Sequence, residues 1–87
     1  MAMSSYGFAQ ITDRPTHFRV VHWMRVRNES PTLSIDVEVR ARESLEASED
    51  GESQRIGPLA ELAYTHACTL EMTSRGGAVT LTWESLP

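Results

Sequence analysis

The chain has 87 residues, a formal net charge of -4 and a single cysteine, with hydrophobic residues at 40% and charged residues at 23%. This length suits a single domain over residues 1–87, and the balanced composition excludes a wholly disordered chain. The lone cysteine excludes a disulfide scaffold and a zinc ribbon, and the absence of lysine excludes Schiff-base catalysis and a P-loop.

All eight basic residues are arginine, and the longest apolar runs fall far short of the roughly 20 residues that span a bilayer. The N-terminal segment has no signal-peptide pattern. We therefore expect a cytoplasmic protein without membrane contact, in which Cys68 is a free thiol. Nucleic acid is an unfavourable partner, because nonspecific affinity for phosphate backbones requires an excess of basic groups.

Alternation of apolar and polar residues predicts strands in the first half of the chain. Residues 5–11 are expected to form a short edge strand, with Tyr6 and Phe8 on one side. Residues 18–27 and residues 33–42 alternate over a longer stretch, which is the period-2 pattern of a half-buried strand.

The segment between these two strands, residues 28–31, reads "NESP" and suits a short antiparallel connection. A hairpin that joins the two apolar faces sets Trp23 opposite Asp36, with Arg25 on the diagonal of the same aspartate. We therefore expect one core face and one charged face partly neutralised by cross-strand pairs.

Residues 43–57 are acidic and rich in serine, without a sustained period, and predict an exposed loop. Residues 78–86 again alternate, with Val79, Leu81 and Trp83 on one face, and predict a further strand. The net charge of the chain is concentrated in this acidic loop. The loop is explained as a solvated linker, and its alternative role is to attract a basic partner.

The segment 58–75 fits two structures. A helix places Leu62, His66 and Leu70 on one apolar stripe, with a proline at its start and a glycine just beyond its end. A strand fits the alternation from Leu62 to Met72, and would form a hairpin with the following strand over residues 62–86. The composition favours the helix, because the segment lacks valine and isoleucine and is rich in alanine, leucine, glutamate and methionine.

The resulting fold class is α+β, with a small antiparallel-led sheet of 3–4 strands and one helix over residues 58–75 on its apolar face. The alternative is an all-β fold in which residues 62–86 form a hairpin. A domain of this size has a thin core, so association with a second copy, most simply as a dimer, would add stability.

The only candidates for chemistry are weak. His66 and Cys68 point to nearly opposite sides of a helix and share a face only on a strand, so packing explains them better than a catalytic pair. An acid/base role for His66 or His22, with Tyr64 nearby, would require a cavity between helix and sheet. No catalytic, cofactor-binding or metal-binding motif is present, so we expect neither a cofactor nor a metal.

The best candidate surface is the predicted strand face with Arg19, Trp23, Arg25 and Arg27. Tryptophan and arginine are enriched at protein-binding hot spots, and an indole flanked by guanidinium groups also stacks on bases. The leading hypothesis is a small, non-enzymatic adaptor that self-associates and binds a protein on this face. A small-molecule or acid/base enzyme subunit is the alternative, and a binder of single-stranded nucleic acid is the third possibility.

Overall fold

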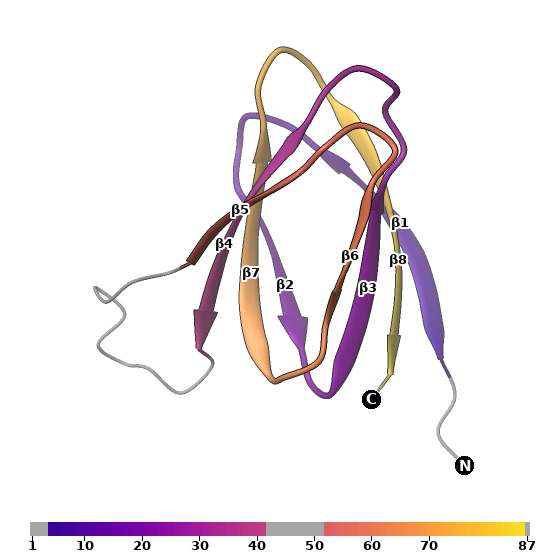
Figure 1. Ribbon diagram of the computed structural model, residues 1–87, viewed down its shortest axis with the longest axis vertical. Helices are drawn as coiled ribbons and strands as arrows, with labels where there is room; N and C mark the ends of the chain where they lie inside the picture. The colour runs from indigo at the N-terminus through magenta and orange to yellow at the C-terminus, as the bar shows by residue number, and fades with distance from the viewer. Residues whose placement is uncertain (1–3, 42–51, 87) are drawn as a thin grey trace.

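The structure is a computed structural model that describes residues 4–41 and 52–86, and all its regular elements are strands (Figure 1). They are β1 (Ser5–Ile11), β2 (Thr16–Val20), β3 (Trp23–Asn28), β4 (Ile35–Ala41), β5 (Glu52–Ile56), β6 (Glu61–Tyr64), β7 (Cys68–Ser74) and β8 (Val79–Leu86). No helix forms in these two ranges. The predicted α+β class is therefore wrong, and the all-β alternative had the right class.

Residues 58–75, predicted as a helix, contain β6, β7 and the turns beside them. Along β7, Cys68, Leu70 and Met72 are buried, while the residues between them are only partly covered. This period of two places one face on the core, which a helix over the same residues would not do. The helix propensity of alanine, leucine and glutamate was outweighed by burial of the alternating apolar face between two sheets.

The strands form two antiparallel sheets of four strands each. Sheet A has the order β1-β8-β3-β6, and sheet B has the order β2-β7-β4-β5. This order is that of a jelly roll, in which eight antiparallel strands wrap as two Greek keys around one core. Unrelated functions occur on this fold, so function has to be argued from the surfaces of this molecule.

The predicted strand over residues 18–27 is interrupted by a bend at Val21 and His22. The bend passes the chain from sheet B to sheet A, so β2 and β3 lie in different sheets. The predicted hairpin with residues 33–42 is consequently wrong: β3 pairs with β6 and β8, and β4 pairs with β5 and β7. Alternation of residues is continuous through such a corner, so the pattern alone did not reveal it.

The alternative hairpin over residues 62–86 is also absent, because β7 belongs to sheet B and β8 to sheet A. The chain crosses between them through Gly76 and Gly77, whose φ angles are 92° and 150°. Side chains rarely tolerate these angles, which explains the glycine pair. The Leu33 side chain covers both glycines and closes this end of the core.

Two other predicted elements are confirmed: residues 5–11 form the edge strand β1, and residues 78–86 contain β8. Of the predicted acidic loop over residues 43–57, the C-terminal part forms β5 instead of loop. Residues 43–51 lie outside the described part of the chain.

The core between the sheets is built from fully buried aliphatic side chains and one methionine. They include Ile11, Val26, Ile35, Leu70, Met72 and Leu81, each with 0% exposure. Burial of one such side chain contributes about 2 kcal/mol. Both sheets supply these residues, so neither sheet is stable without the other.

Candidate interaction surface

The structure places the two candidate imidazoles outside the core. His66 lies in the link between β6 and β7, and His22 lies in the bend between β2 and β3; both are exposed. The expected burial of His66 in an apolar stripe is therefore wrong, because the helix that would have carried it does not form. Cys68 is buried, so it does not face the same surroundings as His66.

Tyr64, the third weak catalytic candidate, is buried in β6, and its hydroxyl donates a hydrogen bond to Gln54 Oε1 at 2.9 Å. Burial, helped by the nearby Cys68 and Glu52, raises the pKa of Tyr64 to about 12. Burial also raises the pKa of the Cys68 thiol. Both groups are thus held in their protonated forms near neutral pH, which makes them poor nucleophiles and bases. The Tyr64–Gln54 bond instead ties sheet A to sheet B.

The four residues of the predicted Arg/Trp face are divided between two sheets. Arg19 is exposed on β2 in sheet B, whereas Trp23, Arg25 and Arg27 lie on β3 in sheet A. On β3 these three residues alternate with the buried Met24 and with further core positions, so they share the outer face of sheet A. Three of the four predicted contact residues therefore remain together.

Ion pairs with residues of sheet A and of the loop after β3 neutralise the arginines of this face. The Nη2 atom of Arg25 lies 2.7 Å from Glu84 Oε1, and its Nε atom lies 3.9 Å from Glu61 Oε2. The Nε atom of Arg27 lies 3.3 Å from Glu29 Oε2. Such exposed pairs add less than about 1 kcal/mol each, but they reduce the positive potential available to a phosphate backbone.

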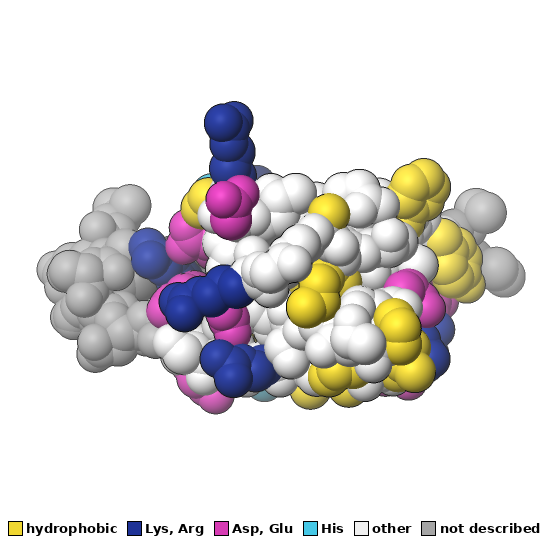
Figure 2. Space-filling model, turned by 90° about the horizontal axis from the view of Figure 1, so that it is seen from above, with side chains coloured by type: hydrophobic (Ala, Val, Ile, Leu, Met, Phe, Trp, Pro, Cys, Tyr) yellow, Lys and Arg dark blue, Asp and Glu magenta, His cyan; other side chains and the backbone are white. Residues whose placement is uncertain are grey.

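The outer face of sheet A also carries two exposed aromatic side chains that belong to β1. Tyr6 is 71% exposed and Phe8 is 74% exposed. Figure 2 shows most hydrophobic side chains of its view gathered toward the right-hand end, the side on which β1 lies in Figure 1. Tyr6 borders a shallow hollow of about 140 Å³ that Arg25 and Glu84 also line. Aromatic residues beside arginine are the composition of protein-binding hot spots.

The pairing of β1 with β8 requires a glycine at position 7. A methyl group at this position would overlap the indole ring of Trp83, which lies directly over the glycine. All seven residues of β1 are paired with β8 in one continuous register, from Ser5 opposite Ser85 to Ile11 opposite Val79. The edge strand is therefore long and without a bulge.

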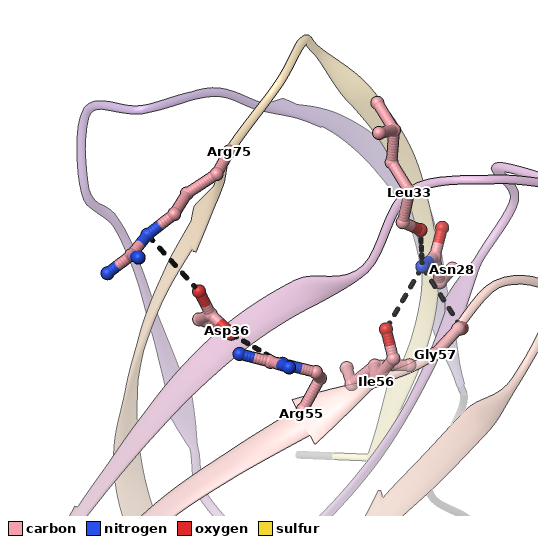
Figure 3. Close-up of polar contacts among 7 residues, drawn as sticks. All are labelled: Asn28, Leu33, Asp36, Arg55, Ile56, Gly57 and Arg75. Carbon is pink, nitrogen blue, oxygen red and sulfur yellow. Dashed lines mark hydrogen bonds and ion pairs between the residues drawn. The ribbon is translucent and has the colours of Figure 1, made fainter.

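The outer face of sheet B is a network of its own ion pairs. Asp36 lies 3.0 Å from Arg55 Nε and 3.8 Å from Arg75 Nε (Figure 3). The predicted pairing of Asp36 with Trp23 and Arg25 is wrong, because those residues lie in the other sheet. A broad hollow of about 540 Å³ beside these residues is lined mainly by polar side chains from β4, β5 and β7.

Asn28, predicted as a turn residue, is a fully buried polar residue at the end of β3. Its Nδ2 group donates hydrogen bonds to the carbonyl oxygens of Leu33, Ile56 and Gly57 at 2.7 to 3.1 Å (Figure 3). Its Oδ1 atom accepts a hydrogen bond from the Ser30 amide. Asparagine directly after an alternating strand was the only sequence signal, and it does not distinguish a turn from a buried anchor.

Within residues 4–41 and 52–86, no group of three His, Cys, Asp or Glu side chains is arranged to hold a metal ion. The same ranges contain no long apolar helix of the kind that crosses a bilayer. The chain matches no family model, no curated protein and no solved structure in comparisons with known proteins. The protein is therefore classified by its strand order alone, as an eight-stranded jelly roll whose edge strand β1 carries exposed aromatic side chains.

Proposed function

We propose that this chain is a small, non-enzymatic protein-binding module of the cytoplasm that associates with a second copy of itself through sheet A. The contact is made by the edge strand β1 and its exposed aromatic residues, Tyr6 and Phe8. The face formed by Trp23, Arg25 and Arg27 lies on the same sheet and is presented by each copy to further protein partners.

The observation that carries this proposal is the contrast among the four edge strands. Strand β1 has seven residues and no charged side chain. Each of the other edges is shorter and carries charge: β2 has Arg19, β5 has Glu52 and Arg55, and β6 has Glu61. Charged side chains and short length protect sheet edges from pairing with other chains, and β1 has neither protection.

The uncharged character of β1 also favours a second copy as the occupant. Two identical charged edges repel one another, whereas two copies of β1 bring together only uncharged side chains. An acidic or basic peptide, by contrast, finds no complementary charge on this strand. The small core gives a further reason, since association adds buried surface that an 87-residue chain lacks.

Sedimentation velocity over a range from micromolar to hundreds of micromolar protein tests self-association. The wild-type chain is expected to shift from monomer to dimer as concentration rises. Phe8→Glu is expected to remain monomeric, because it places two carboxylates at the contact. Phe8 is 74% exposed, so the substitution leaves the core intact.

Val21→Glu is the matched control for this experiment. Val21 is another exposed hydrophobic residue, but it lies in the bend between β2 and β3 and not in the edge strand β1. The same charge change there should leave the dimer unaffected. A wild-type chain that stays monomeric over the whole concentration range would contradict the proposed function.

A further inference from the structure

We infer that the dimer forms by antiparallel pairing of β1 with β1 of the second copy, with the two-fold axis passing beside Phe8. This inference rests on the proposed function and adds the register of the contact. The two four-stranded A sheets then become one continuous sheet across the dimer. The register follows from the direction in which the backbone groups of β1 point.

A backbone hydrogen bond of β8 indicates which of its residues have amide and carbonyl groups that point away from β1. The Glu29 amide donates to the Thr80 carbonyl oxygen at 3.0 Å, so the backbone groups of Thr80 point toward β3. Thr80 is also the partner of Gln10 in the register between β1 and β8. Because residues in an antiparallel pair alternate between hydrogen-bonded and non-hydrogen-bonded positions, Gln10 and Thr80 form a non-hydrogen-bonded pair.

The backbone amide and carbonyl of Gln10 consequently point to the free edge of sheet A, and by alternation those of Phe8 and Tyr6 do so as well. Directly after β1, the carbonyl oxygen of Thr12 accepts a hydrogen bond from the Ser74 amide in β7 of sheet B at 2.8 Å. The free edge therefore offers three residues whose donors and acceptors have no strand beside them within residues 4–41 and 52–86.

A two-fold axis restricts how two copies of this edge can pair. An axis at Phe8 sets Phe8 opposite its own copy and sets Tyr6 opposite Gln10 of the second copy, on both sides of the axis. All three outward-facing residues then occupy hydrogen-bonded positions, each pair with two hydrogen bonds. An axis at Gly7 or Ala9 places only two of these three residues opposite one another. The Phe8 register therefore gives hydrogen-bond partners to the largest number of backbone groups on the free edge.

The side chains fit the same register. The side chains of Tyr6, Phe8 and Gln10 lie on the outer face, so the two Phe8 rings become cross-strand neighbours, with a tyrosine on each side. On the inner face the axis brings Gly7 opposite Ala9 of the second copy, two small residues that leave room for the Trp83 ring over Gly7. Aromatic cross-strand pairs stabilise a sheet in addition to its backbone hydrogen bonds.

Cysteine cross-linking under mild oxidation tests the register. Phe8→Cys is expected to form a disulfide-linked dimer, because residues opposite each other in a hydrogen-bonded pair have Cα atoms about 5.5 Å apart. Tyr6→Cys is the matched control, since it is equally exposed and lies on the same strand. In this register the two Tyr6 positions are four residues apart, about 13 Å, and should not cross-link.

Mixing the Tyr6→Cys and Gln10→Cys chains should restore cross-linking, because these positions face each other across the axis. Wild-type protein controls for Cys68, which is buried. A second test mixes the Phe8→Glu chain with the Phe8→Lys chain. Each variant alone should be monomeric, and the mixture should form dimers at a protein concentration at least tenfold lower than either variant alone would require.

The outcomes separate the two proposals. Cross-linking of Tyr6→Cys but not of Phe8→Cys, with a wild-type dimer in sedimentation, would overturn the register and leave the proposed function standing. A monomeric wild-type chain would overturn both. Cross-linking of Phe8→Cys alone, together with dimers in the Glu and Lys mixture, would establish the Phe8 axis.

Discussion

At the scale of single residues, Tyr64 links a buried hydroxyl to the pH dependence of stability. Its pKa is raised from 10.0 to about 12, first by burial and then by the nearby Cys68 and Glu52. The folded protein thus keeps the proton that the unfolded chain releases above pH 10. The stability from this group is complete below pH 10 and is lost as pH rises toward 12.

We therefore expect the free energy of unfolding to fall by on the order of 2 kcal/mol between pH 10 and pH 12. Tyr64→Phe should flatten this part of the curve. At pH 7 it should cost about 1 kcal/mol, because the hydrogen bond to Gln54 is lost. Urea denaturation from pH 7 to pH 12 measures both effects. The raised pKa of Cys68 adds a decrease that Tyr64→Phe does not remove, and an unchanged slope in the variant would contradict the assignment to Tyr64.

At the scale of elements, the turn between β5 and β6 contains the one non-glycine residue with a positive φ in the described ranges. Leu59 has a φ of 59°, and the amide of Ala60 donates to the Gly57 carbonyl oxygen at 3.1 Å. With Pro58 at the second position, this is the geometry of a type II turn, which favours glycine or asparagine where Leu59 stands.

Leu59→Asn should raise the free energy of unfolding by about 0.5–1 kcal/mol, because asparagine tolerates this conformation better than leucine. Leu59→Val should lower it by about 1 kcal/mol, since a β-branched side chain is more strongly disfavoured at positive φ. Thermal unfolding of the two variants provides a matched comparison at one exposed position. Equal melting temperatures would show that the turn is not strained at Leu59.

Also at this scale, the alternation of residues predicted the strands over residues 5–11 and 78–86, and Val79 and Leu81 lie on the buried face of the second strand as expected. The same pattern failed at Val21 and His22, where a corner interrupts a continuous alternation. It failed again over residues 58–75, where helix propensity competed with a strand pattern. In both places a long-range contact decided the outcome, since each strand is stabilised by partners distant in the chain.

At the scale of the whole molecule, Asn28 holds the two sheets together. It lies at the end of β3 in sheet A and donates to carbonyl groups at the end of β5 in sheet B and in the adjoining loops. Asn28→Ala should lower the free energy of unfolding by about 3 kcal/mol, because it leaves several buried polar groups without partners. Chemical denaturation followed by tryptophan fluorescence measures this loss.

Gln10→Ala is the control for the Asn28 variant at protein concentrations where the chain is monomeric, since it also removes a side-chain amide, but from an exposed hydrogen bond with Thr80. It should change stability by less than about 0.5 kcal/mol. A similar small change for Asn28→Ala would show that the buried network does not stabilise the contact between sheets.

The candidate surface was predictable only in part. Tyr6 and Phe8 could be placed on one side of an edge strand, and Trp23, Arg25 and Arg27 on one face, because these relations depend on a local period of two. The sequence could not show that Arg19 lies in the other sheet, or that Glu84 and Glu61 neutralise Arg25. Those facts depend on which strands are neighbours.

The sequence by itself determined the composition limits, the missing lysine chemistry and the alternating faces of most strands, because these follow from residue identity and local backbone geometry. Only the tertiary structure decided the strand order, the exposure of His22 and His66, and the position of β1 at an uncharged edge. Alternation is the same whichever strand lies alongside. Pairing is selected by the burial of two apolar faces in one core, which is a property of the whole chain.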